Sequence, residues 1–96
     1  MTDLQHLKKR DIRAPLPLGH APRGYVGQIH RLATDQAQSS LADGELESRL
    51  IELGFVEGAR VEILHEGIVG RDPIAVRVDN VTIAIRRREA MAIIVA

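Results

Sequence analysis

The feature that most constrains the fold is a leucine stripe that ends in glycine and runs directly into a strand. Three leucines within residues 46–53 are spaced as one face of a helix. Gly54 stands where a left-handed residue would end that helix, and Phe55 is the apolar residue expected to fold back on the last turn. Residues 59–66 then alternate apolar and polar, as a half-buried strand does. The chain is therefore predicted to hold a short helix joined tightly to a strand.

Length and composition limit the class of protein. A chain of 96 residues predicts one domain. Hydrophobic residues make up 45%, but the only aromatic residues are Tyr25 and Phe55, so the core must be aliphatic and rich in the β-branched residues that favour strands. Thirteen basic and thirteen acidic residues cancel, which gives no general attraction to nucleic acid or to an anionic membrane. The absence of cysteine excludes disulfides, thiolate zinc sites and a thiol nucleophile.

The hydropathy pattern predicts a cytoplasmic protein. No apolar run approaches the length of a membrane span. The first ten residues are polar and charged and lack the apolar stretch of a secretory signal. We therefore expect no direct insertion into a membrane.

Alternating apolar residues predict five short strands and a barrel. The predicted strands span residues 25–32, 59–66, 74–78, 81–85 and 91–95. Asp79 and Asn80 separate two of them, and both residue types tolerate the positive φ of a type I′ hairpin turn. Residues 86–90 are predicted to form one short helical turn. A strand, a helix and four more strands indicate a mainly β fold, a small barrel that leaves few free edges.

Two boundaries follow from local signals. Residues 1–13 are expected to be poorly ordered, since a polar terminus needs contacts to hold it, and the domain is predicted to span residues 14–96. The prolines in residues 14–19 favour an extended segment whose leucines lie under the barrel edge. The helix begins between Leu41 and Glu45, with Ser40 and Asp43 as alternative capping residues.

Three segments resemble the FeoA family, the small cytoplasmic proteins of bacterial ferrous-iron uptake. Residues 49–58 resemble its leucine-x-x-leucine-glycine, x-x-glycine signature. Residues 70–74 are similar to its Gly-Asp-Pro-Ile loop with Arg71 as an extra residue, and residues 81–90 are similar to its final arginine-bearing hairpin. The resemblance covers about residues 16–96 and implies a five-stranded SH3-like barrel with a short α-helix inserted after the first strand.

The resemblance also implies a function. It points to a non-enzymatic accessory protein that docks on the cytoplasmic part of the large FeoB ferrous-iron transporter and biases its assembly or conformational cycle. The same barrel resembles the C-terminal domain of iron-dependent repressors. This chain has no room for the helix-turn-helix domain and metal sites of those repressors, so the stand-alone protein is the better match.

Motifs of catalysis are missing from the sequence. It contains no G-x-S-x-G, no G-x-x-x-x-G-K and no H-E-x-x-H. We therefore predict that the protein is not an enzyme and requires no cofactor.

One position could hold a surface metal ion. His65 and Glu66 lie at a predicted strand end, but neighbouring strand residues point to opposite faces, so one ligand is expected rather than both. A zinc or ferrous ion could complete its shell across an interface between two molecules. The alternative function is thus a metal-responsive regulator that forms a homodimer, and a solvated strand end is the simpler interpretation.

The predicted partner-binding residues come from two segments. Ile51, Phe55 and Val56 would form an apolar patch if they were exposed together. Ile68 and Val69 lie in a glycine-bounded loop, where an adaptor would place its contacts. The full predicted contact set is Ile51, Phe55, Val56, Ile68, Val69, Arg71 and Asp72.

The arginines of residues 86–88, with Arg71 and Arg77, are the candidates for a basic patch. A binder of single-stranded nucleic acid would also need stacking aromatic residues, and Tyr25 is the one candidate that the sequence offers. A solvated arginine face is the favoured interpretation, with an acidic protein surface as the next choice, and no nucleic-acid partner is predicted.

Overall fold

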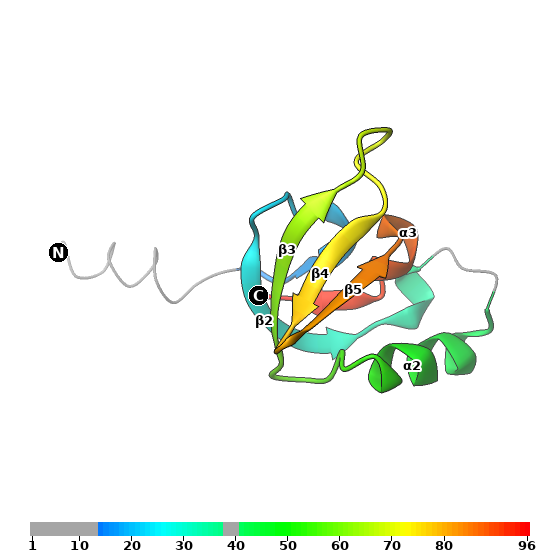
Figure 1. The fold of residues 1–96 in the computed structure, drawn as a ribbon. Coiled ribbons are helices and arrows are strands. Elements are labelled where there is room, and N and C mark those ends of the chain that lie inside the picture. The colour runs from blue at the N-terminus through cyan, green and yellow to red at the C-terminus, as the bar shows by residue number, and fades with distance from the viewer. Residues whose placement is uncertain (1–13, 38–40) are drawn as a thin grey trace, which may run out of the picture.

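The computed structural model describes residues 14–37 and 41–96 as one strongly coiled antiparallel sheet with a helix against it (Figure 1). The strand order is β1-β6-β2-β3-β4-β5. The strands are β1 (Leu16–Pro17), β2 (Val26–Leu32), β3 (Arg60–Glu66), β4 (Ile74–Val78), β5 (Val81–Ile85) and β6 (Ile93–Val95). The helical elements are η1 (Leu18–His20), η2 (Thr34–Gln36), α2 (Asp43–Glu52) and α3 (Arg87–Ala90). The mainly β fold with a helix after its first long strand is confirmed.

The helix α2 ends as the sequence predicts. Gly54 has φ of 103°, its N–H donates to the carbonyl of Ile51, and the N–H of Phe55 donates to the carbonyl of Leu50. These two bonds are those of a Schellman motif, which closes a helix through a residue with positive φ. At the other end Ala42 occupies the N-cap position and Asp43 is the first helical residue, so Asp43 is not the cap. Ser40 lies outside the described residues.

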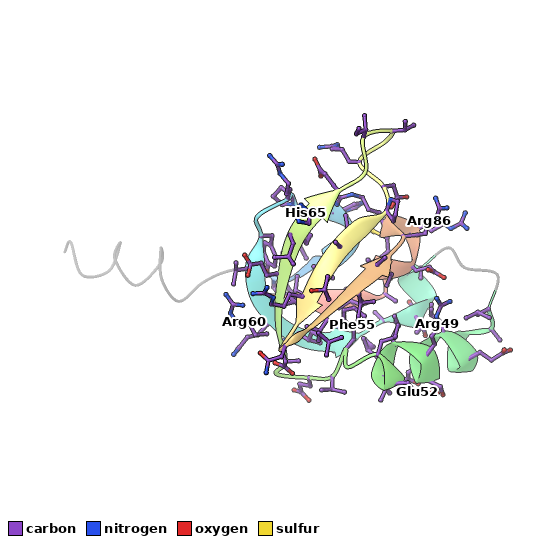
Figure 2. All side chains as sticks on the ribbon, in the orientation of Figure 1. Arg49, Glu52, Phe55, Arg60, His65 and Arg86 are labelled. Atoms are coloured by element: carbon purple, nitrogen blue, oxygen red, sulfur yellow. The ribbon has the colours of Figure 1, made fainter. Side chains whose placement is uncertain are left out.

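The core is aliphatic, with Phe55 at its centre. Leu46 and Leu50 are 2% and 1% exposed, which confirms that the leucine stripe faces inward. The inward residues of β3 and β4 meet this stripe, and Phe55 fills the space between helix and sheet with no exposed surface (Figure 2). Each fully buried aliphatic side chain contributes about 1.5–3 kcal/mol, so this layer is the main stabilising term.

The hairpin between β4 and β5 differs from the prediction in its turn type. Val78 pairs with Val81 across the predicted two-residue connection. Asp79 has φ of 53°, whereas Asn80 does not have a positive φ. A positive φ at the first position alone is the pattern of a type II′ turn rather than type I′. The hairpin is therefore confirmed, and the predicted type I′ turn is wrong.

Residues 16–19 are fixed to the domain by strand pairing and by burial in the core. Leu16 pairs with Val95, and Leu18 is fully buried in the core. A Cβ atom on Gly19 would collide with the backbone carbonyl of Arg87, so glycine permits η1 to approach α3 closely. This short strand adds a sixth member to the five predicted strands. The predicted disorder of residues 1–13 lies outside the described residues.

Candidate interaction site

Arg87 donates hydrogen bonds to partners that lie 16 to 68 residues away from it in the sequence. Its Nε donates to the carbonyl of Arg71 at 2.8 Å, and Nη1 donates to the carbonyls of Gly19 and Ala21 at 3.1 and 2.7 Å. Its Nη2 donates to Oε1 of Glu66 at 2.9 Å. The side chain is 18% exposed. A guanidinium offers several donors in a rigid plane, so one side chain can hold residues 19–21, β3 and the β3–β4 loop in fixed positions.

The loop between β3 and β4, residues 67–73, is fixed at its base and apolar at its tip. A carboxylate oxygen of Asp72 accepts the backbone N–H of Arg87 at 2.8 Å. A Cβ on Gly67 would collide with the carbonyl of Asp72, so the two ends of the loop are in close contact. Ile68 and Val69 at the tip are 100% and 87% exposed. We call these two residues the loop tip.

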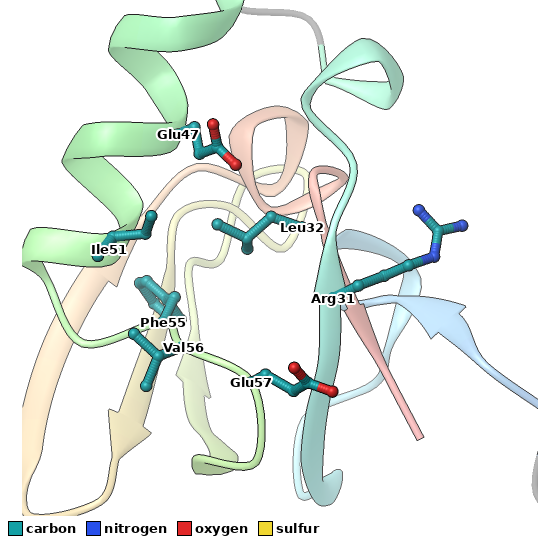
Figure 3. A pocket seen from close by; sticks show the side chains of 7 residues that line it. All are labelled: Arg31, Leu32, Glu47, Ile51, Phe55, Val56 and Glu57. Atoms are coloured by element: carbon teal, nitrogen blue, oxygen red, sulfur yellow. The ribbon is translucent and has the colours of Figure 1, made fainter.

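An apolar hollow lies between α2 and β2 (Figure 3). Its volume is about 280 Å³. The lining residues are Arg31, Leu32, Glu47, Ile51, Phe55, Val56 and Glu57. Figure 3 shows the carboxylates of Glu47 and Glu57 at the two ends of the hollow, while the guanidinium of Arg31 points away from it. We call this feature the α2–β2 groove.

The structure separates the predicted contact residues into these two places. Ile51 and Val56, 47% and 44% exposed, lie at the groove beside α2, and the loop tip lies at the far end of the β3–β4 pair (Figure 1). The condition that Phe55 be exposed together with them is not met, because the Schellman motif turns its side chain into the core. The motif that marks Phe55 in the sequence already requires an apolar contact with the last helical turn, so the signal was present.

The arginines of residues 86–88 do not form one solvated face. Arg86 and Arg88 are exposed, whereas Arg87 is half-buried in its hydrogen bonds. The predicted solvated face is therefore wrong for Arg87, because the helical turn α3 begins there and aims its side chain at the loop. Nothing in the local sequence marks Arg87 among its neighbours, since its partners lie 16 to 68 residues away.

His65 and Glu66 are not brought together as a ligand pair. His65 is exposed at the end of β3 (Figure 2). The Glu66 carboxylate is paired with Arg87. Within residues 14–37 and 41–96 no group of three or more acidic, histidine or cysteine side chains could hold a metal ion. Of the predicted pair, His65 alone remains a candidate metal ligand. In the same residues no helix is long and apolar enough to cross a membrane.

The sequence profile of the FeoA domain matches residues 16–96. This chain belongs to the FeoA family. The FeoA of Stenotrophomonas maltophilia, solved in complex with zinc, is 30% identical over 82% of this chain and 87% of that chain, with a TM-score of 0.65. That protein is described as an SH3 domain protein and as a candidate activating factor of ferrous iron transport. The SH3-like fold inferred from the family resemblance is confirmed.

Two further structures define the range of the similarity. Iron(II) transport protein A of Clostridium thermocellum is 30% identical over 83% of this chain and 44% of that chain, with a TM-score of 0.65. A manganese-dependent transcriptional repressor is 18% identical over 91% of this chain and 45% of its own, also with a TM-score of 0.65, and shares the fold alone. No curated protein sequence matches this FeoA-family chain significantly.

Proposed function

We propose that this chain is a non-enzymatic accessory protein of bacterial ferrous-iron uptake that docks on the cytoplasmic part of a FeoB-type transporter. Membership of the FeoA family supports the connection with iron transport. The proposal places the protein in the cytoplasm and gives it no catalytic step of its own.

The observation that carries the proposal is the loop tip. Ile68 and Val69 are the two most exposed large aliphatic side chains among the residues that the structure describes. Such exposure in the free protein leaves apolar area available for burial in a complex, at about 25 cal/mol per Å². The loop base is fixed by Arg87 and Asp72, so binding requires little ordering of the loop.

The arrangement also suggests how docking would act on a transporter. A bound protein shifts a conformational equilibrium only by its difference in affinity for the two states. A rigid loop with two aliphatic side chains discriminates between a state that presents a matching apolar pocket and a state that does not. A transporter with a nucleotide-dependent cytoplasmic domain has two such states to offer.

The test is binding of the purified chain to a detergent-solubilised FeoB-type transporter, with and without a GTP analogue. We expect binding whose affinity differs between the two nucleotide conditions. Equal affinity in both conditions would make the protein a constant subunit rather than a regulator. Absence of binding by a folded chain would overturn the proposal.

A further inference from the structure

The α2–β2 groove combines an apolar surface with acidic neighbours, whereas the loop tip consists of two aliphatic side chains. Its apolar lining comes from Leu32, Ile51 and Val56 over the buried Phe55, and Ile51 and Val56 are partly exposed. On the α2 side, residues 43–57 carry five acidic side chains and one basic side chain, Arg49, and on the β2 side the lining residue Arg31 directs its guanidinium away from the hollow. Arg49 lies 3.7 Å from Glu89, so its charge has an acidic neighbour of its own. The chain as a whole is neutral, which makes this acidic surround a local property.

Residues 1–13 have the complementary composition. They contain four basic side chains and two acidic ones, and three of the basic residues, Lys8, Lys9 and Arg10, are consecutive. Leu4 and Leu7 precede this basic run at a spacing of three residues. The same short segment therefore carries two aliphatic anchors and a concentrated positive charge.

The sheet register places Leu16, which follows this segment in the chain, within reach of the groove. Leu16 pairs with Val95, and Val95 also pairs with Ile29 of β2, whose last residue, Leu32, lines the groove. Two strand spacings and three residues along β2 separate Leu16 from Leu32 by about 14 Å. The ten residues 4–13 span up to about 33 Å when extended, which is more than enough to turn back to the groove.

We propose that residues 1–13 of the same chain dock in the α2–β2 groove. Leu4 and Leu7 would then pack against Ile51 and Val56, and the basic run of residues 8–10 would lie beside Glu47 and Glu57. A hollow of about 280 Å³ suits one or two aliphatic side chains rather than a larger ligand. The charge term is exposed, so it should weaken as salt rises from 0.1 M to 1 M and the Debye length falls from about 10 Å to about 3 Å. This surface is separate from the loop tip and does not depend on a transporter.

The test uses the full chain with one nitroxide spin label. The natural sequence has no cysteine, so Gln5→Cys provides a single attachment site. We expect paramagnetic broadening of the Ile51 and Val56 methyl signals at low salt, with the loop-tip methyl signals of Ile68 and Val69 unaffected. Broadening should decrease in 1 M salt and in the same chain carrying Lys8→Glu, Lys9→Glu and Arg10→Glu.

Two outcomes would overturn the proposal. Unbroadened Ile51 and Val56 signals in the labelled chain at low salt would exclude docking in the groove. A sample that mixes labelled chain with isotope-enriched unlabelled chain detects contact between molecules alone. Broadening of equal strength in that mixture would assign the groove to a second copy rather than to the same chain. Failure of transporter binding would alter neither result, so the two proposals are tested separately.

Discussion

At the scale of single residues, Arg87 connects the fold to the proposed function. Its four donated hydrogen bonds reach Gly19, Ala21, Glu66 and Arg71. Hydrogen bonds from a charged donor each contribute about 1.5–3 kcal/mol, and their sum is reduced by exposure and by non-additivity. Arg87 therefore both stabilises the fold and fixes the base of the β3–β4 loop.

Replacement of Arg87 by alanine should lower the free energy of unfolding by about 2–4 kcal/mol, because it leaves the Glu66 carboxylate and three backbone carbonyls without their donor. Arg87→Lys should recover little of this, since an ammonium group cannot reproduce the planar fork. Arg88→Ala is the matched control, because Arg88 is exposed and should change stability by no more than about 0.5 kcal/mol. Urea unfolding measures all three, and equal midpoints for the Arg87 and Arg88 alanine variants would contradict this account.

At the scale of elements, the end of α2 determines how the helix meets the sheet. Gly54 adopts φ of 103°, which lets the chain reverse and turn Phe55 inward. A Cβ at Gly54 would lie 3.5 Å from Cγ1 of Val78, an ordinary contact, so space is not the constraint. The constraint is the left-handed backbone conformation, which is strongly disfavoured for a residue that has a Cβ atom.

Gly54→Ala should therefore lower the free energy of unfolding by about 1–2 kcal/mol. Gly44→Ala, in the first turn of the same helix, is the matched control. A Cβ at Gly44 meets no atom within 4 Å, and Gly44 does not have a positive φ. That substitution should raise stability by up to about 1 kcal/mol, because alanine has the higher helix propensity. Thermal unfolding of both variants gives the comparison, and a shift of the same sign in both would refute it.

The sequence predicts the elements well because their signals are local. The leucine period and Gly54 locate α2, and the alternation on both sides of residues 79–80 locates the β4–β5 hairpin, without reference to distant residues. The hydrogen bonds of Arg87 cross up to 68 residues, and no local pattern distinguishes Arg87 from Arg86 or Arg88. The exposure of Ile51 likewise depends on how α2 packs on the sheet, whereas the Schellman motif already marks Phe55 for burial. The groove has no local signal because two of its lining residues, Arg31 and Leu32, come from β2, whereas the other five lie within residues 47–57.

At the scale of the whole molecule, two apolar surfaces lie at opposite ends of a neutral protein. The β3–β4 loop stands at one end and α2 lies at the other (Figure 1). The loop carries the exposed loop tip, and the α2–β2 groove lies beside the helix. The zero net charge of the sequence hides this difference, because five of the thirteen acidic residues lie within residues 43–57, beside one basic residue. The predicted contact set spans both ends, and a single flat interface would not cover it. We propose the loop tip as the contact of the transporter and the groove as the contact of residues 1–13.

The decisive measurement compares the affinity of two double variants for a FeoB-type transporter. Ile68→Ser with Val69→Ser alters the loop tip, and Ile51→Ser with Val56→Ser is the matched control at the groove. All four side chains are at least 44% exposed, so both variants should fold. We predict that the loop-tip variant binds at least about tenfold more weakly, which corresponds to about 1.4 kcal/mol, and that the groove variant does not. Wild-type affinity in the folded loop-tip variant would contradict the account.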